Sequence, residues 1–268
     1  MIYINNENFV LPSPTAVVAG NFDGLHTGHM KLINNMKTAA KAYGLKTAVV
    51  SFLPHPTVYF GKTPELKRLL VNEEKKLMLK KHGIDYYIEL PFNKKLAELP
   101  PLGFFDLVLI SKLKCNMFVI GEDFCFGKNR AGNTETARKI CAGKRIELNI
   151  VSTQNCGFTG GKVSSTLIRE LILQRKIGQA NGLLGYEYFV LGKASLNNIE
   201  NPSTTLEIAV SEYKLLPPDG AYAIEVAFGI KTFMCIAKVE NRTIQAFLST
   251  CEEMAEDGEV VLKFLSAL

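Results

Sequence analysis

Two of the four histidines in this chain stand three residues apart, in the stretch GNFDGLHTGHMKLI, Gly20 to Ile33. His26-Thr27-Gly28-His29 falls where a short apolar run passes into a helical pattern. Backbone N–H groups at a helix N-terminus attract phosphate, Gly28 permits close approach of a ligand, and imidazoles can donate hydrogen bonds to phosphate oxygens. The stretch therefore predicts a phosphate-binding site.

Two other interpretations of these histidines remain open. They could be zinc ligands, although no third ligand follows at a suitable spacing and the cysteines lie elsewhere in the sequence. They could also be loop histidines that do no more than satisfy nearby backbone groups. The spacing alone does not decide between these alternatives.

A second stretch, VSSTLIR from Val163 to Arg169, has hydroxyl residues just before a helical pattern. One such residue is usually an N-cap, but Ser164, Ser165 and Thr166 are more than one cap requires. Arg169 lies one turn into the helix, where its guanidinium could join them around a phosphate. The preceding Gly160-Gly161-Lys162 adds a flexible, cationic approach.

The elements that must position these residues alternate between strands and helices as far as Leu184. Strands are expected at 16–20, 47–52, 85–90, 117–121 and 146–152. Helices are expected at 30–43, 73–82, 104–113, 134–142 and 164–174, followed by a short helical turn, and Leu77 and Met78 should face inward. This alternation predicts an α/β, Rossmann-like domain with a parallel sheet covered on both faces. Its ligands should bind beyond the carboxyl ends of the strands, where the polar segments 20–29, 52–56 and 121–133 lie.

The pattern changes after Tyr186, which predicts domains at 1–185 and 186–268. Short strands without intervening helices are expected at 189–191, 206–210, 221–228, 232–239, 243–248 and 260–264. They predict a small all-β, barrel-like domain. Charge reverses at the same place: residues 1–185 are net +11 and residues 186–268 are net −6, within a total of +5. The basic part suits an anionic partner, although lysines on solvated helix faces account for most of its charge.

Composition excludes several other classes. No apolar run is long enough to cross a membrane, and the N-terminus MIYINNENFV is not a secretory signal. The six cysteines are scattered, which favours reduced thiols and a cytoplasmic location. No basic motif interleaved with aromatic residues indicates RNA binding. We therefore expect no membrane and no nucleic acid as partners; the oligomeric state cannot be predicted.

Four motifs in order carry a resemblance to a known family. HxGH after the first strand and SSTxIR at a late helix resemble the nucleotidylyltransferase superfamily. Within it, GNFDGLHTGH, SFLPHP, GEDFCFGKNRAGN and VSSTLIR together resemble the bacterial FAD synthetases, over residues 14–186. Those proteins are usually bifunctional, with an N-terminal FMN adenylyltransferase and a C-terminal riboflavin kinase.

The resemblance implies roles for particular residues. Phe52, Pro54 and Pro56 would form a wall for the isoalloxazine ring of FMN, with Phe126 closing the pocket; alternatively, Phe52 and Phe126 are core residues. Asp23 would hold nearby polar groups or the metal shell, and Asp123 would lie where the flavin phosphate meets the nucleotide. The residues implied to bind ATP are Gly20, Asn21, Phe22, His26, His29, Ser164, Ser165, Thr166 and Arg169.

The implied reaction is FMN + ATP → FAD + pyrophosphate. FMN attacks through a phosphate that is already ionised, so catalysis consists mainly of positioning and of neutralising charge. His26, His29, Asp123 and Arg169 would carry it. Mg²⁺ would come with ATP, held more by phosphates and water than by a dedicated protein site.

The second domain departs from the family. The kinase's glycine-rich loop and PTAN motif correspond to KASLNNIEN, without glycine, and to Pro202-Ser203-Thr204-Thr205. Gln245 and Phe247 stand where the kinase has its catalytic glutamate and a histidine, although 216–222 still resembles the kinase barrel. We expect a kinase-like barrel without kinase activity. The rival functions are nucleotidyl transfer to another phosphate substrate and a non-enzymatic flavin or RNA sensor.

Overall fold

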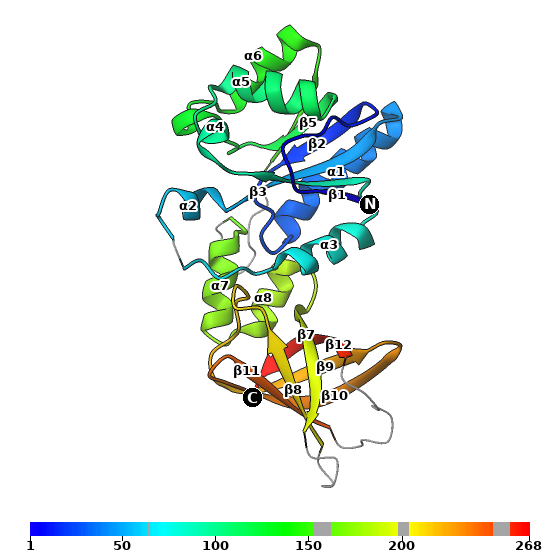
Figure 1. Cartoon of the computed structure of the whole chain (residues 1–268), viewed down its shortest axis with the longest axis vertical. Coiled ribbons are helices and arrows are strands. Elements are labelled where there is room, and N and C mark those ends of the chain that lie inside the picture. The colour runs from blue at the N-terminus through cyan, green and yellow to red at the C-terminus, as the bar shows by residue number, and fades with distance from the viewer. Residues whose placement is uncertain (64, 153–161, 198–203, 249–257) are drawn as a thin grey trace. The chain divides into compact units, whose positions relative to one another are not determined.

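The structure, a computed structural model, describes residues 1–63, 65–152, 162–197, 204–248 and 258–268 (Figure 1). Its contacts divide the chain into two compact units. The first contains residues 1–66 and 76–162, and the second contains residues 67–75 and 163–268. The domain boundary expected at residue 185 stays a prediction; in this division the two helices before it cluster with the strands that follow it.

The first unit is built on a six-stranded sheet in the order β1-β4-β3-β2-β5-β6. Every neighbouring pair of strands is parallel, which confirms the α/β prediction. Each of the five expected strands is present with ends shifted by at most two residues, and β1 was not predicted. The strands are β1 Ile2–Ile4, β2 Thr15–Ala19, β3 Lys46–Leu53, β4 Tyr86–Pro91, β5 Cys115–Gly121 and β6 Glu147–Val151.

Helices connect these strands, and two expectations about them were wrong. The helix expected at 104–113 is the end of α5 followed by a π-helix, η1. Met78 is buried but Leu77 is 45% exposed, because consecutive helical residues point in directions about 100° apart. The helices are α1 Thr27–Tyr43, α2 Pro56–Tyr59, α3 Asn72–Lys81, α4 Lys94–Ala97, α5 Pro101–Phe104, η1 Phe105–Lys112, the 3-10 turn η2 Lys128–Arg130 and α6 Thr134–Lys144.

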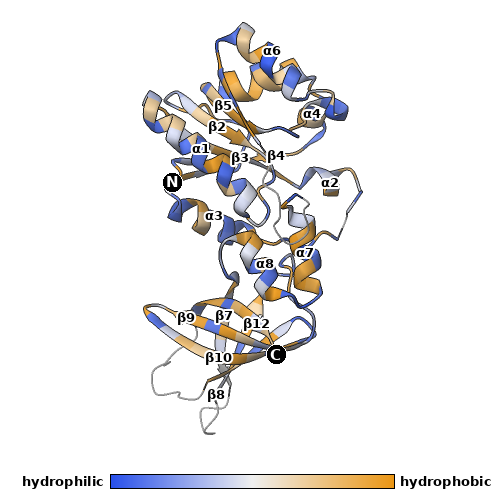
Figure 2. Cartoon of the chain, turned by 180° about the vertical axis from the view of Figure 1, so that it is seen from behind, coloured by the Kyte–Doolittle hydropathy of each residue, from blue (hydrophilic) through white to orange (hydrophobic). Residues whose placement is uncertain are grey.

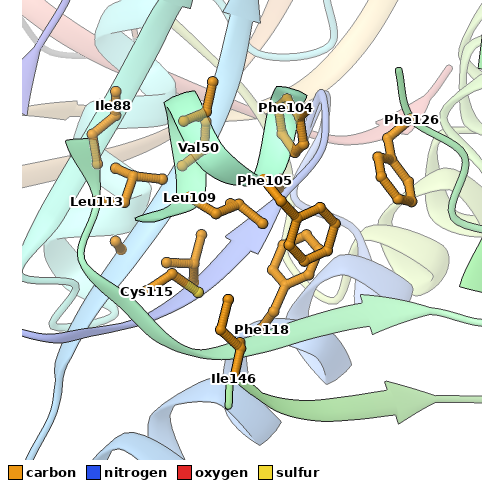
Figure 3. Packing of buried hydrophobic residues seen from close by; sticks show 14 of the residues in the cluster. Val50, Ile88, Phe104, Phe105, Leu109, Leu113, Cys115, Phe118, Phe126 and Ile146 are labelled. Carbon is orange, nitrogen blue, oxygen red and sulfur yellow. The ribbon is translucent and has the colours of Figure 1, made fainter. Parts of the chain in front are cut away.

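Apolar side chains alternate between the two faces of this sheet, and both faces are covered. Helix α1 packs on β2, β3 and β5 through one face, where its Ile33, Met36 and Ala40 are buried. A cluster that joins strand residues such as Val50 to Phe105 of η1 fills another part of the core (Figure 3). In Figure 2 the strands of the sheet are mostly apolar, whereas α1 alternates between apolar and polar positions. This is the pattern of a parallel sheet buried on both sides.

The second unit contains two helices and a closed barrel of antiparallel strands in the order β10-β11-β8-β7-β12-β9. The barrel confirms the predicted all-β fold, and all six expected strands are present. The elements are α7 Ser165–Leu173, α8 Ile177–Leu184, β7 Tyr188–Asn197, β8 Thr204–Val210, β9 Gly220–Phe228, β10 Lys231–Glu240, β11 Thr243–Leu248 and β12 Gly258–Ala267.

Among the described helices, none is both long enough and apolar enough to span a bilayer. The cysteines that the structure describes are free thiols, as expected: Cys115, Cys125, Cys141 and Cys235.

Candidate functional site

The candidate site of the first unit lies at the carboxyl ends of β2, β3 and β5. Because β3 and β5 pair with opposite edges of β2, their loops leave the sheet side by side. The strand order also reverses direction between β2 and β5, and such a switch point is where open α/β sheets bind ligands. The three polar segments expected at this edge are therefore neighbours.

The turn after β2 has an unusual backbone. Phe22, Gly24 and Leu25 have φ angles of +48°, +86° and +39°, and left-handed conformations are uncommon for side chains such as Phe and Leu. Both of these side chains are buried, at 1% and 0% exposure. The Phe22 ring lies against Gly20, where an added Cβ would be 3.4 Å away, and packs edge-on to the His29 imidazole at 5.2 Å. Phe22 thus positions His29 from within the protein.

His26 is the N-cap of α1, and its Nδ1 accepts a hydrogen bond from the His29 N–H at 3.3 Å. The two imidazoles are stacked, with ring centres 3.7 Å apart and planes inclined by 17°. Burial, with a smaller contribution from the positive charge of Lys162, lowers the pKa of His26 to about 4 against the opposing charge of Asp23. His26 is therefore neutral at pH 7. Because Nδ1 is an acceptor, the ring proton is on Nε2, which leaves a neutral N–H donor.

Three charged residues accompany the histidines. Asp23 is 2% exposed and acts electrostatically on His26. Lys162 forms an ion pair with the exposed carboxylate of Asp123, which follows β5. The structure therefore associates Asp23, His26, His29, Asp123 and Lys162 in one unit. From its place in the sequence, Lys162 was expected only as part of a cationic approach, and the adjoining Gly160 and Gly161 lie outside the described residues.

Three more of the predicted residues, Gly20, Asn21 and Gly28, lie in the turn after β2 or at the start of α1. Gly28 is in the first turn of α1, and Asn21 is half-buried in the turn after β2. The Gly20 N–H donates to the Val50 carbonyl of β3 at 3.0 Å, which fixes the start of the turn against the neighbouring strand. A ligand at the N-terminus of α1 would meet this turn directly.

An aromatic cluster occupies the ends of β3 and β4, beside the predicted proline wall. Phe92 lies 5.9 Å from Phe52, 5.2 Å from Tyr59 and 5.9 Å from Phe60, measured between ring centres. We call these four residues the aromatic cluster. Tyr59 and Phe60 are 39% and 57% exposed. Of the four, only Phe52 was predicted from sequence, because Phe92 comes close to it through the pairing of β3 with β4.

The prolines of the wall border this cluster. Pro54 is exposed, and Pro56 is half-buried at the first position of α2, whose N-cap is His55. The Phe92 N–H donates to the Leu53 carbonyl at 2.7 Å, so the two strand ends are joined where the wall begins. An apolar, partly exposed surface beside a turn that is predicted to bind phosphate can accept the ring of a ligand that also carries phosphate.

Phe126 lies in the core. It is 7% exposed, and its ring packs against Phe104 and Phe105 (Figure 3). The ring also stacks on Phe124, with ring centres 5.4 Å apart. This matches the alternative that the sequence left open. A ligand could meet Phe126 only if neighbouring residues moved.

The other predicted phosphate cradle belongs to the second unit. Ser164 is the N-cap of α7, and its Oγ accepts a hydrogen bond from the Leu167 N–H at 3.2 Å. Ser165 and Thr166 form the first turn of the helix. Arg169 is half-buried, and its Nε donates to the Lys67 carbonyl at 3.1 Å. One hydroxyl therefore serves as the cap, and the binding roles expected of Ser165 and Thr166 stay predictions.

Comparison with known proteins adds three kinds of similarity. The model of the FAD synthetase family matches residues 10–167. The chain is 33% identical over 224 residues to a bifunctional riboflavin kinase/FMN adenylyltransferase of Listeria monocytogenes, covering 82% of this chain and 70% of that protein. It is 28% identical over 229 residues to the protein with the same description in Escherichia coli K12, covering 83% and 72%. A crystal structure titled as a macrolide-efflux protein from Streptococcus pneumoniae shares the fold, with a TM-score of 0.87, 24% identity, and coverage of 100% of this chain and 91% of that one.

Proposed function

The chain belongs to the FAD synthetase family, and from that premise we propose that it transfers the adenylyl group of ATP to the phosphate of FMN, giving FAD and pyrophosphate. The observation that carries the proposal is the turn after β2, where neutral His26 and stacked His29 lie at the N-terminus of α1. That arrangement offers N–H donors to a triphosphate at the N-terminus of a helix, where the backbone N–H groups also attract phosphate.

Each histidine has its own part in binding ATP. His26 would donate through Nε2–H, because its Nδ1 is already bonded to the His29 N–H. His29, held edge-on by Phe22, would donate to the phosphates released as pyrophosphate. Gly20, Asn21 and Gly28 would let the backbone of the turn and of α1 approach the nucleotide closely. In the second unit, Ser165, Thr166 and Arg169 are proposed as further ligands of ATP, on the strength of their motif.

The flavin would bind at the aromatic cluster and the proline wall. Tyr59 and Phe60 are large and exposed, and Pro54 and Pro56 fix a rigid, non-helical surface beside them. Flat isoalloxazine packs well against aromatic rings and proline edges. The described geometry supports Phe52 as part of this surface, and it supports Phe126 only as a core residue.

The reaction itself needs little from the protein beyond geometry. An oxygen of the FMN phosphate attacks the α-phosphorus of ATP in line, a new P–O bond forms, and the bond from the α-phosphorus to the bridging oxygen breaks. Charge that builds on the departing pyrophosphate is met by His26, His29 and Arg169. Asp123 and Lys162 supply a carboxylate and an ammonium beside the turn, which suits the meeting point of the two substrates.

Mg²⁺ is the metal proposed for this reaction. It prefers hard oxygen ligands and keeps several waters, so the phosphates of ATP would hold most of it. Among this chain's own residues, the exposed carboxylate of Asp123 has the chemistry that a hydrated Mg²⁺ accepts, and Asp23 would act on the site by its charge. Bound Mg²⁺ would neutralise charge on the triphosphate.

We also propose that the barrel has no riboflavin kinase activity. Gln245 of β11 lies opposite Glu207 and Lys238 in the sheet, and a carboxamide cannot take a proton from a hydroxyl as a carboxylate can. Phe247, at the position of the kinase histidine, is 41% exposed. Pro202, Ser203 and residues 198–201 of the loop lie outside the described residues.

The test is a pair of incubations of the full chain with ATP and Mg²⁺, one with FMN and one with riboflavin, analysed by chromatography. The expected results are FAD from FMN and no FMN from riboflavin. His29→Ala should lose activity, and His82→Ala is the matched control outside the site. No FAD from the wild type, or equal rates from the wild type and His29→Ala, would refute the adenylyltransferase; rapid FMN formation would refute the loss of kinase activity.

A further inference from the structure

A segment from the middle of the chain, residues 67–75, is built into the second unit together with α7, α8 and the barrel. We call this segment the strap. Arg68 forms a parallel bridge with Lys214, in the connection between β8 and β9. The Arg68 N–H donates to the Tyr213 carbonyl at 2.7 Å, and the Leu215 N–H donates to the Arg68 carbonyl at 2.8 Å. The strap is therefore joined to the barrel by backbone pairing.

A buried ion pair reinforces this pairing. Lys214 Nζ lies 2.7 Å from Glu74 Oε2, and both side chains are 0% exposed. The same ammonium donates to the Leu69 carbonyl at 2.6 Å and lies 4.4 Å from the centre of the Tyr188 ring. Two charges removed from water are stable only when their geometry is good and their other hydrogen-bonding groups are satisfied. This pair meets that condition, so it holds the strap in one arrangement.

The Glu74 carboxylate also accepts two backbone N–H groups. Oε2 accepts from the Val71 N–H at 3.0 Å, at the start of α3, in the manner of a capping box. Oε1 accepts from the Leu191 N–H of β7 at 2.9 Å. One carboxylate thus joins the strap, the first turn of α3, a barrel strand and Lys214.

Arg169 depends on the same strap. Its Nε donates to the Lys67 carbonyl at 3.1 Å, one residue before the bridge between Arg68 and Lys214. The guanidinium is a planar fork, so fixing its Nε edge sets the direction in which the fork can meet a phosphate. A chain of direct contacts therefore runs from the barrel through Lys214 and the strap to Arg169.

We propose that Glu74 and Lys214 are positioning residues for adenylyl transfer, and that the barrel serves this reaction by holding the Arg169 guanidinium in the orientation that binds the triphosphate. This inference rests on the proposed function, because it takes Arg169 as a ligand of ATP. It gives the barrel a part in FAD formation that does not need kinase chemistry.

The test replaces the ion pair by a neutral pair. Glu74→Gln combined with Lys214→Met removes both charges, keeps side chains of similar length and leaves no lone charge buried. In the full chain, the KM for MgATP should rise about tenfold, the order expected from weakening a charge-assisted contact to phosphate. The Kd for FMN, measured by flavin fluorescence, should change less than about twofold, because Arg169 is proposed as a ligand of ATP and not of the flavin. The matched control is Lys46→Met with Asp85→Asn. This change removes an ion pair at the amino ends of β3 and β4.

A double-mutant cycle separates positioning from stability. In an Arg169→Ala background, the neutral pair should change kcat/KM for MgATP by less than about twofold, because the group that it orients is gone. A merely structural role predicts the same loss with and without Arg169. Equal losses in both backgrounds, or an unchanged KM in the folded pair variant, would overturn the proposal.

Two further measurements keep the test decisive. If the neutral pair does not fold, Glu74→Asp takes its place, because it shortens the side chain without removing its charge. The same double-mutant cycle with Glu74→Asp should again show a loss that depends on Arg169. Titration calorimetry with MgATP repeats the cycle as Kd without turnover. A wild-type chain that makes no FAD refutes the proposed function, whereas a chain that makes FAD but gives an additive cycle refutes only the positioning role.

Discussion

The buried imidazole of His26 should make the stability of the chain depend on pH in a way that one substitution removes. Its pKa falls from 6.5 to about 4 in the folded protein because burial disfavours the charged ring. Whether the free energy of unfolding rises or falls with pH depends on which state, folded or unfolded, binds this proton more tightly. Between pH 6.5 and 4 the unfolded chain takes up this proton and the folded chain does not, so stability present above pH 6.5 is lost as the pH falls.

The full loss amounts to about 3 kcal/mol, at about 1.4 kcal/mol for each tenfold change in proton affinity. By pH 4.5 the loss should already be about 2.5 kcal/mol. His26→Asn keeps an N-cap for α1, since asparagine is among the best capping residues, but it has no group that titrates in this range. His82 and Asp85, whose pKa values are also lowered, are present in both proteins and cancel in the comparison.

The assay is urea unfolding of the wild type and His26→Asn at pH 7.5 and at pH 4.5. The wild type should lose about 2.5 kcal/mol more than the variant between these two values. NMR titration of the His26 ring gives the pKa directly and should place it near 4 in the protein without nucleotide. Equal losses in the two proteins, or a ring that titrates near 6.5, would refute the lowered pKa that burial gives to this cap.

Three further predictions concern the site and the core. His29→Ala should lower kcat for FAD formation by about 10²–10³, measured beside His82→Ala, and a loss below about threefold would contradict its role in meeting the charge of the leaving pyrophosphate. Phe60→Ser should weaken FMN binding about tenfold in a fluorescence titration. Tyr43→Ser, on the exposed end of α1, is the control and should leave FMN binding unchanged. Similar effects of the two substitutions would argue against the aromatic cluster as the flavin surface. Gly132→Ala should destabilise the protein by about 1–3 kcal/mol in urea, because its Cβ would be 2.8 Å from the Phe126 ring, and unaltered stability would show that this ring moves easily.

The regular elements were predictable from sequence because their apolar periods are strong. The run Ala16–Ala19 is buried throughout, as a strand of a parallel sheet covered on both faces requires. The run Ala221–Phe228 alternates in burial, as a barrel strand with one face inward requires. The exception in the sheet is β1, Ile2–Ile4, a three-residue strand too short to show a period, whose place depends on its parallel pairing with β4. The π-helix η1 has the same apolar composition as an α-helix and could not be distinguished from one.

The candidate site was predictable where one short segment supplies several groups. His26, Gly28 and His29 are adjacent in sequence, and so their common place at the start of α1 follows from local structure. The aromatic cluster was not predictable, because Phe92 joins Phe52 only through the pairing of β3 with β4. The same holds for the left-handed backbone at Phe22, since no glycine or asparagine at that position signals it.

The ion pair of the strap could not be predicted from sequence motifs. Glu74 and Lys214 are 140 residues apart and belong to segments that sequence analysis assigned to different domains. Each alone is typical of a solvated helix or loop. Only the fold shows that both are fully buried and paired, with Arg169 anchored to the same segment.

The most direct test of the central claim follows the phosphorus atoms of ATP. The full chain is incubated with FMN, Mg²⁺ and ATP labelled with ³²P at either the α or the γ position, and the products are separated by chromatography. Adenylyl transfer predicts that α-label appears in FAD and γ-label appears in pyrophosphate, in equal amounts. Label from the γ position in a flavin, or α-label that never leaves the adenine nucleotides for FAD, would contradict the account.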